Sequence, residues 1–343
     1  MLMNASEITI GIIGATGVVG TEMLKVLEQR NVAFGGLKLY ADANDAGKRI
    51  VFRGKEYVVE EATDDSFDGV DILLVAVGNA VSEHFSPIAV RKGAVVIDNS
   101  SAFRLDPDVP LIVPEVNPED IENIKKGIIA NPNCSTIIAM VAVNALFKQF
   151  KVDRMIVSTY QAVSGAGING LRELEVQAAQ YVKGEPVSPA KAFQHQIAFN
   201  LIPHIDFFED NGYTHEEMKM VNEGRKILHM PELKISCTCV RVPVFRSHSE
   251  SIYIEFAEKV TVEQAQQAIA AAKGTKLVDD PANNVYPMPL DTSNQDLIYV
   301  GRVRQDITCD NALNLWCCGD QIRKGAATNA VQIAELIIEK KCS

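Results

Sequence analysis

Residues 7–20 read EITIGIIGATGVVG, and this stretch decides the fold of the first part of the chain. A short β-branched run leads into the pattern Gly14-Ala15-Thr16-Gly17-Val18-Val19-Gly20, and helical periodicity then continues to Leu27. Glycines between a first strand and a first helix permit a tight turn, and they let the amides of the helix N-terminus approach a pyrophosphate. The motif at this position predicts dinucleotide binding, and a turn that merely packs tightly is the alternative.

The segments that follow repeat the alternation of strand and helix. Three compact hydrophobic runs without strict alternation are typical of strands that are buried on both faces. Helical stretches with short connections, such as residues 82–93, lie between them. This pattern predicts a parallel, doubly wound α/β sheet. The three runs are LKLYAD (37–42), VDILLVAV (70–77) and AVVIDNS (94–100).

The pattern changes after residue 133. Residues 134–150 form a helix that is apolar nearly all round, and residues 152–163, 235–244 and 248–258 alternate with period two, as strands with one covered face do. Residues 182–232 are predicted to form long connections and one helix over 214–228, and residues 324–341 a C-terminal amphipathic helix. We therefore expect a dinucleotide-binding domain from 1–133 plus 325–343, and an α+β catalytic and dimerisation domain from 134–324.

Composition excludes several classes of protein. The 33 Lys+Arg and 44 Asp+Glu residues give a net charge of −11, which disfavours binding to nucleic acid or to an anionic membrane. The uncharged run from Gly127 to Phe147 is interrupted by Asn-Pro-Asn, and the roughly 11 apolar-rich residues after the interruption are too few to span a bilayer. Seven cysteines without zinc-site spacing indicate neither a disulfide framework nor a metal site, and the N-terminus has no signal-peptide pattern. A cytoplasmic protein is expected.

Cys134 is the clearest candidate for a catalytic residue. It follows Asn131-Pro132-Asn133 and lies within one residue of the predicted N-terminus of the buried helix. The dipole and free amides there favour a thiolate, and the same amides, with the Asn133 side chain, can hold an oxyanion. The alternative is a small cysteine of the core.

Asp42 and two residues of the second half are weaker candidates. Asp42 lies 22 residues beyond Gly20 at the end of the second strand, where a carboxylate can bind the ribose 2′-OH of NAD and repel a 2′-phosphate. It could also be a solvated loop aspartate.

His248 and Arg241 stand near the ends of predicted strands and are weaker candidates for functional residues. The alternatives are that His248 is a histidine in a wet turn and that Arg241 is an arginine on a solvated sheet face.

At these residues the sequence resembles the aspartate-β-semialdehyde dehydrogenase family. The resemblance covers nearly the whole chain, and the combination of NPNCST with a downstream RVPV and HSE is its most specific part. The matching motifs are GATGVVG (14–20), DNSSAFR (98–104), VPEVNP (113–118), NPNCST (131–136), QAVSGAG (161–167), EEMK (216–219), RVPV (241–244), HSE (248–250) and GDQIRKGAATNAVQIAE (319–335).

The resemblance implies a fold and a reaction. The fold would be a Rossmann domain plus an α+β domain, in the architecture of glyceraldehyde-3-phosphate dehydrogenase. The reaction would convert L-4-aspartyl phosphate reversibly to L-aspartate 4-semialdehyde and phosphate with NADP or NAD, on the route to lysine through diaminopimelate, threonine, methionine and isoleucine. Cys134 would form the thioester, His248 would be the acid/base, and Gln161 would orient the acyl intermediate.

The resemblance also implies binding residues. Arg241 would grip the α-carboxylate with two hydrogen bonds, and Glu216 would take the α-ammonium. Lys219 and Arg104 would hold the phosphate; without the resemblance, Glu216 and Lys219 would be read as a surface salt bridge. Ser164, Gly165 and Gln321 would contact the nicotinamide end of the cofactor.

The loop after the second strand departs from the family. NADP-using members usually show Ser and Arg there, in a pattern like S-x-R-S-A-G, whereas this chain has Asp42-Ala43-Asn44-Asp45-Ala46-Gly47. The arginine that would pair with a 2′-phosphate is absent and a carboxylate stands nearby. We therefore predict that NAD is used at least as well as NADP.

Two other functions remain in view at this point. One is an acyl-phosphate reductase for another substrate, such as acetylglutamyl phosphate, which would share the cysteine. The other is a non-catalytic scaffold that binds a nucleotide or partner. The resemblance implies a homodimer or homotetramer, with the α+β sheet as the interface.

Overall fold

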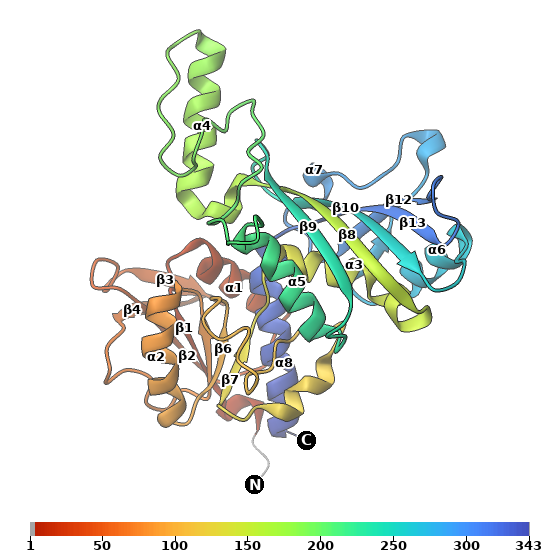
Figure 1. Ribbon diagram of the computed structural model, residues 1–343. Coiled ribbons are helices and arrows are strands. Elements are labelled where there is room, and N and C mark those ends of the chain that lie inside the picture. Colours follow the sequence, from red (N-terminus) through yellow and green to blue (C-terminus); the bar gives the residue numbers. More distant parts are fainter. Residues whose placement is uncertain (1–3, 343) are drawn as a thin grey trace. The chain divides into compact units, whose positions relative to one another are not determined.

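The computed structural model describes residues 4–342, and the chain forms two compact units (Figure 1). One unit contains the residues up to Asn133 together with the segment from Ala326 onward, and the other contains Cys134–Gly325. The predicted fold class, a doubly wound Rossmann domain plus an α+β domain, is confirmed.

The first unit is built on a seven-stranded sheet in the order β3-β4-β2-β1-β5-β6-β7. All neighbours are parallel except β3 and β4, which form an antiparallel hairpin at one edge. The C-terminal helix α8 packs against α1 and β6, so the end of the chain completes the core of this unit. Its elements are β1 (Thr9–Ile13), α1 (Val18–Gln29), β2 (Gly36–Ala41), β3 (Arg49–Phe52), β4 (Lys55–Glu61), β5 (Ile72–Val75), α2 (Asn79–Arg91), β6 (Val95–Asp98), β7 (Ile128–Ala130) and α8 (Thr328–Cys342).

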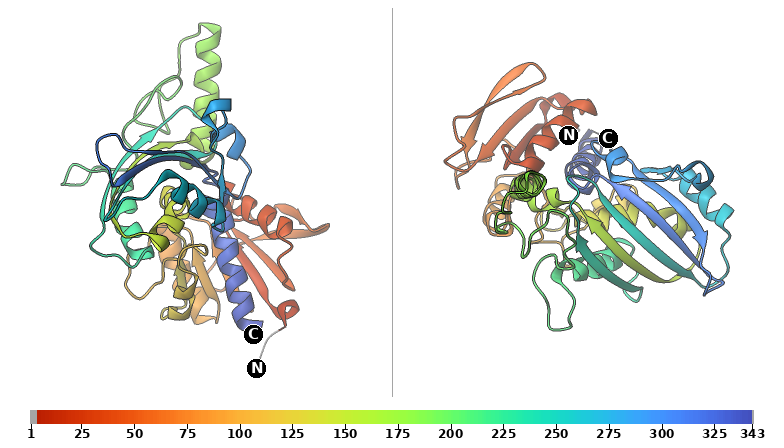
Figure 2. Two further views of the ribbon diagram at one scale, coloured as in Figure 1. Left: turned by 90° about the vertical axis from the view of Figure 1, so that its right-hand side faces the viewer. Right: turned by 90° about the horizontal axis from the view of Figure 1, so that it is seen from above.

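The second unit is built on a mixed six-stranded sheet in the order β11-β12-β13-β10-β8-β9. The helix α3 is buried almost all round, as its apolar sequence predicts, and it contacts four of these strands as well as α5. The helix α4 extends away from the sheet of its own unit (Figure 2). The elements are α3 (Cys134–Gln149), β8 (Val152–Gln161), α4 (Gly167–Lys183), α5 (His215–Ile227), β9 (Lys234–Arg241), β10 (His248–Phe256), α6 (Val262–Ala271), β11 (Thr275–Leu277), α7 (Pro289–Thr292), β12 (Ile298–Gln305) and β13 (Ala312–Gly319).

Strand ends and helix starts bring polar side chains together in the second unit. Strands β8 and β9 run parallel, so Gln161 pairs with Arg241 at their carboxyl ends. Strand β10 runs antiparallel to β8 and begins at His248, next to Gln161. The sheet therefore places one glutamine, one arginine and one histidine at a single edge, close to the first residue of α3.

Candidate active site

Cys134 is the first residue of α3, and its side chain is half-buried. The chain enters this helix through Asn131-Pro132-Asn133, where a proline cannot continue a preceding helix. The first amides of a helix have no partners within it, and the helix dipole is positive at this end. The position therefore favours a thiolate and offers donors to an oxyanion.

His248 lies against this cysteine. Its Nε2 is 3.4 Å from the Cys134 Sγ, and its Nδ1 accepts a hydrogen bond of 3.0 Å from the backbone N–H of Ala162. His248 has no exposed surface, and it is the only buried histidine of the six. Burial and, to a smaller extent, the positive charge of Arg241 lower the pKa of His248 to about 3, with Glu216 acting in the opposite direction.

Gln161 joins this pair to the next group of residues. Its Nε2 donates to the Glu216 Oε1 at 3.1 Å and lies 3.4 Å from the His248 Nε2. Its Oε1 accepts a hydrogen bond of 3.0 Å from the Thr159 hydroxyl, which fixes the orientation of the amide. Gln161 is therefore held between the histidine and the carboxylate.

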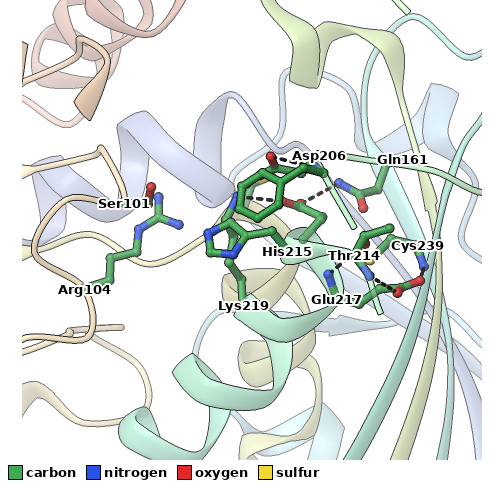
Figure 3. Close-up of polar contacts among 12 residues, drawn as sticks. Ser101, Arg104, Gln161, Asp206, Thr214, His215, Glu217, Lys219 and Cys239 are labelled. Atoms are coloured by element: carbon green, nitrogen blue, oxygen red, sulfur yellow. Dashed lines mark hydrogen bonds and ion pairs between the residues drawn. The ribbon is translucent and has the colours of Figure 1, made fainter. Parts of the chain in front are cut away.

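Glu216 and Lys219 lie in α5, on the same face of the helix. The Lys219 Nζ is 3.1 Å from the Glu216 Oε2 and 2.8 Å from the Asp206 Oδ2 (Figure 3). The side chains of Glu216 and Lys219 are only 7% and 15% exposed, so this is no ordinary surface salt bridge. Burial alone would lower the pKa of Lys219, but the charges of Glu216 and Asp206 outweigh it and the pKa is raised.

Arg241 ends β9 and is also buried. Its Nη1 donates to the carbonyl of Ala162 at 2.8 Å. Burial lowers the pKa of Arg241, and the negative charges of Glu216 and of a Cys134 thiolate oppose that change. A buried guanidinium with donors to spare beside a buried carboxylate is suited to a small zwitterionic ligand.

The residues next to Arg241 and His248 include Ser164, Gly165 and Gln321. The Gln321 Nε2 donates to the Ser164 hydroxyl, and its Oε1 accepts from the backbone N–H of Ser247 at 2.9 Å. A Cβ at Gly165 would lie 2.7 Å from the Arg241 Nη1 and 3.3 Å from the His248 Cε1. Only glycine leaves these two side chains where they are.

Three further residues support the site and were not anticipated from the sequence. Thr159 alternates with Gln161 along β8, so its period-two spacing could have identified it. Asp206 reaches Lys219 from an irregular loop that carries no pattern. Gly325 lies against Cys134, since a Cβ there would be 2.9 Å from the Cys134 Cβ.

The glycine-rich loop of the first unit has the shape that a dinucleotide requires. Gly14 has a φ of +81°, and a Cβ on it would collide with the Ala76 carbonyl. A Cβ on Gly20 would collide with the Gly14 carbonyl, so the first turn of α1 and the loop can pack with their backbones in contact only because residue 20 is glycine. Gly17 is the N-cap of α1 without a side-chain hydrogen bond to the helix amides. The residues present therefore fit a pyrophosphate at this helix N-terminus.

Asp42 lies at the end of β2 and is exposed, and its Oδ1 accepts from the backbone N–H groups of Asn44 and Asp45 at 2.9 and 3.2 Å. Asp45 is the carboxylate that contacts the glycine-rich loop. Hydrogen bonds from Lys48 and then from Thr16 hold the pKa of Asp45 below its usual value. One loop thus carries two carboxylates.

Arg104 and Asn133 are also buried in the first unit. The Arg104 Nε donates to the Asn131 carbonyl at 3.0 Å, and its Nη2 donates to the Asn99 carbonyl at 2.9 Å. These bonds fix the direction of the guanidinium. Asn133 immediately precedes α3.

Other kinds of site find little support. Within residues 4–342, no group of three or more His, Cys, Asp or Glu side chains could hold a metal ion. All seven cysteines are free thiols. In the same part of the chain, every helix is too short or too polar to cross a bilayer.

Comparison with known proteins identifies relatives along nearly the whole chain. Residues 9–124 match the semialdehyde dehydrogenase NAD-binding domain family, and residues 143–324 match the semialdehyde dehydrogenase dimerisation domain family. The aspartate-semialdehyde dehydrogenase of Aquifex aeolicus is 50% identical over 96% of this chain and 98% of the relative. That of Bacillus subtilis is 47% identical over 95% of this chain and 96% of the relative.

The comparison with solved structures identifies the same family. Aspartate semialdehyde dehydrogenase II of Vibrio cholerae, in complex with ASA, superposes with a TM-score of 0.94 at 44% identity, covering 97% of this chain and 98% of the other. The Candida albicans enzyme with NADP has a TM-score of 0.76 at 25% identity, covering 98% and 99%. By sequence along nearly its whole length and by fold, the chain belongs to the aspartate-semialdehyde dehydrogenase family.

Proposed function

We propose that the protein catalyses the reversible reduction of L-4-aspartyl phosphate to L-aspartate 4-semialdehyde and phosphate, in the biosynthesis of lysine, threonine, methionine and isoleucine. The observation that carries this proposal is the contact of 3.4 Å between the Cys134 Sγ and the His248 Nε2, at the start of a buried helix. A nicotinamide cofactor would supply the hydride. The chain's own residues bind the substrate, form the covalent intermediate and orient it.

Cys134 is the nucleophile in this proposal. Its sulfur attacks the acyl carbon, the bond to phosphate breaks, and a thioester remains on the enzyme. The amides at the start of α3 and the Asn133 side chain stabilise the oxyanion, and Gln161 and His248 orient the acyl group.

The charges of the site match the three charged groups of the substrate. Arg241 binds the α-carboxylate and Glu216 binds the α-ammonium, while Lys219 and Arg104 bind the phosphate. Glu216 is buried beside Lys219, and its carboxylate oxygens can accept further hydrogen bonds from a substrate ammonium. An N-acetylated substrate has no ammonium to offer, so this residue favours aspartyl phosphate over acetylglutamyl phosphate.

The test is phosphate-dependent reduction of NAD and, separately, of NADP by the purified protein with L-aspartate semialdehyde. We expect turnover that is lost by at least about 10³-fold in Cys134→Ser, because a serine hydroxyl is not ionised at neutral pH. Turnover with other acyl phosphates only would replace the substrate assignment. A folded protein with no turnover and a slowly alkylated Cys134 would favour the non-catalytic scaffold.

For the cofactor, we propose that NAD is used at least as well as NADP. The cations beside the loop after β2 already have anionic partners: Lys48 pairs with Asp45, and Arg49 pairs with Glu56. Asp42 and Asp45 add negative charge where a 2′-phosphate would have to bind. A ribose 2′-OH, which is neutral and can donate a hydrogen bond, suits this loop better.

The steady-state kinetics of the two cofactors test this preference. The triple variant Asp42→Ser, Asn44→Arg, Asp45→Ser should shift the ratio of kcat/KM toward NADP by at least about tenfold, the effect of 1.4 kcal/mol. Wild-type protein that favours NADP by more than tenfold would refute the assignment and leave the enzyme proposal intact.

We also propose that the enzyme is a homodimer, or a tetramer of such dimers, through the uncovered face of the six-stranded sheet, and that it works in the cytoplasm. A catalytic thiol must remain reduced, which a reducing compartment ensures.

A further inference from the structure

Asp320 joins three segments of the second unit through one buried carboxylate. It follows β13 directly and has no exposed surface. Its Oδ1 accepts from the backbone N–H groups of Ile322 and Arg323 at 2.9 and 3.1 Å, in the segment after β13. Its Oδ2 accepts from the Arg246 Nε at 2.5 Å, ahead of β10, and from the backbone N–H of Asn294 at 2.6 Å, after α7. A carboxylate has about four lone-pair sites, so all of them hold the chain itself.

Two backbone positions beside this carboxylate have an uncommon conformation. Ser247, next to Arg246, has a φ of +73°, and Asn294 has a φ of +64°. Residues other than glycine seldom adopt positive φ, and they keep it where surrounding contacts hold them. The ion pair with Arg246 and the bond from the Asn294 N–H are contacts of this kind. Asp320 therefore helps to fix both turns.

Gln321, the next residue, has a side-chain amide that is held at both ends. Its Oε1 accepts from the backbone N–H of Ser247 at 2.9 Å, and its Nε2 donates to the Ser164 hydroxyl. A side-chain amide has two N–H groups and two acceptor lone pairs, so one of each remains after these two bonds. The carboxamide of a nicotinamide also has N–H groups and a carbonyl. It can pair with the N–H and the lone pair that remain.

We propose that Asp320 is a positioning residue, whose carboxylate fixes the turn at Ser247 and the segment after β13 so that the Gln321 amide meets the carboxamide of the nicotinamide cofactor. This inference deepens the proposed function and rests on it. Asp320 would touch neither cofactor nor substrate, and it would act on hydride transfer only through Gln321.

The geometry favours this role over that of a simple structural anchor. Asp320 holds the backbone that carries Gln321, and through Arg246 it also holds the turn whose Ser247 N–H orients the Gln321 side chain. Both determinants of the direction of this amide thus depend on one carboxylate. In Asp320→Asn an NH₂ group replaces one oxygen and faces two N–H donors, so two of the four hydrogen bonds are lost.

Equilibrium binding tests the proposal without turnover. The first probe is NADH or NADPH, whichever the wild-type protein binds more tightly, and the second is the matching nucleotide without nicotinamide, ADP-ribose or its 2′-phosphate. We expect Asp320→Asn to weaken binding of the reduced cofactor by about 3- to 10-fold, the effect of one hydrogen bond. The dissociation constant of the ADP-ribose compound should stay within about twofold of the wild-type value.

Asp306→Asn is the matched control. This carboxylate also accepts four hydrogen bonds, but from Thr308, Cys309 and Asn314 between β12 and β13. We expect it to lower stability in urea and to change binding of neither nucleotide. A folded Asp320→Asn that binds the reduced cofactor as wild type does, or that loses affinity equally for both nucleotides, would overturn the proposal.

Arg246→Lys is a milder variant that decides the question if Asp320→Asn does not fold. It keeps the positive charge and removes the planar Nε donor, so affinity for the reduced cofactor should fall by about threefold with binding of the ADP-ribose compound unchanged. Wild-type affinity for both nucleotides in this variant would also count against the proposal.

Steady-state kinetics give a second readout. In Asp320→Asn we expect kcat to fall by about 10- to 100-fold, while KM for aspartate semialdehyde stays within about twofold. Substrate with deuterium on the aldehyde carbon should show a larger isotope effect on kcat than in wild type, because hydride transfer becomes the slow step. A variant with a raised substrate KM and an unchanged kcat would contradict the role. A wild-type protein without turnover would refute the proposed function, whereas the binding comparison would still report on Asp320.

Discussion

Glu250 lies two residues beyond His248 on β10 and has no exposed surface. Its Oε1 has no hydrogen-bond partner within the described part of the chain, and its Oε2 is 3.9 Å from the Cys317 Sγ. Burial raises the pKa of Glu250 well above its usual value. The folded protein therefore binds a proton at pH values where the unfolded chain has lost it, so stability decreases as pH rises above about 4.3.

We predict that Glu250→Gln removes this pH dependence. The amide keeps the shape of the protonated acid, so the variant should gain stability relative to wild type by up to about 1.4 kcal/mol per pH unit above pH 4.3. Urea unfolding at about pH 5 and pH 8 measures the difference. Glu255→Gln, a partly exposed site near the end of the same strand, is the control. A stability difference that is the same at both pH values would contradict a protonated Glu250.

Gly165 supports a second prediction at this scale. In Gly165→Ala the added methyl would press on the Arg241 Nη1 and the His248 Cε1. Because displacing a catalytic group by about 1 Å can cost 10²-fold, we expect kcat/KM for aspartate semialdehyde to fall by about 10- to 100-fold. The Arg241 guanidinium can move, so the unfolding midpoint should change little. A variant whose stability falls while the activity of the folded fraction is preserved would contradict this prediction.

Among the elements, α5 links helix capping to the residues proposed to bind the substrate. The Thr214 hydroxyl accepts from the backbone N–H of Glu217 at 3.3 Å, and the Glu217 carboxylate accepts from the backbone N–H of Thr214 at 2.7 Å (Figure 3). The other oxygen of Glu217 accepts from the backbone N–H of Cys239 at 2.9 Å, which ties the helix to β9. Glu216 and Lys219 lie in this first part of the helix, so their positions depend on the cap.

We predict that Thr214→Ala costs about 1 kcal/mol of stability and also raises KM for aspartate semialdehyde severalfold. The matched control is Thr261→Ala, which removes the same kind of capping box from α6, a helix that carries none of the proposed site residues. Both variants should lose similar stability, measured by chemical denaturation, but only Thr214→Ala should change KM. Equal KM values for the two variants would show that the cap does not position the substrate groups.

The fold could be predicted from the sequence where elements bury long apolar runs, as β1, β5, α3 and α8 do. The hairpin of β3 and β4 was not anticipated, because its strands are rich in charged residues and lie at the edge of a sheet. The helix α4 was also missed. Its buried residues are Gly170, Leu174 and Gln177, and only Leu174, packed against Ile197 and Ile202, is a large apolar residue that signals a buried face.

The residues of the candidate site also differ in how far the sequence predicts them. Cys134 and the glycine-rich loop could be proposed from local pattern, because a helix start and a tight turn have their own sequence signals. The roles proposed for His248 and Glu216 depend on the family resemblance, because periodicity alone also allowed a histidine in a wet turn and a surface ion pair. Asp42 is predicted from its place after a strand, whereas the contact of Asp45 with Thr16 carries no sequence signal, because side-chain direction within a loop depends on contacts that no spacing predicts.

For the whole molecule, the second unit has one sheet face that its own helices leave uncovered. Side chains on this face come from neighbouring positions of three paired strands, and several are apolar or aromatic. Ile156 and Tyr160 on β8 are 41% and 37% exposed, and the Tyr160 ring lies 5.3 Å from that of Trp316 on β13. An apolar patch on a regular sheet is typical of an interface between protein chains.

We predict that the protein is a homodimer or a multiple of it and that this face is the contact, in agreement with the dimerisation domain family matched by residues 143–324. A second copy of the same face is the simplest partner, because a two-fold axis makes a surface complementary to itself. The double variant Ile156→Asp, Tyr160→Asp should place uncompensated charge in the contact and lower the mass in sedimentation to that of one chain. Ile307→Asp, at a residue that is 99% exposed in a turn outside the sheet, should leave the mass unchanged. A folded double variant that keeps the wild-type mass would place the contact elsewhere, and a monomeric wild-type protein would refute the assembly itself.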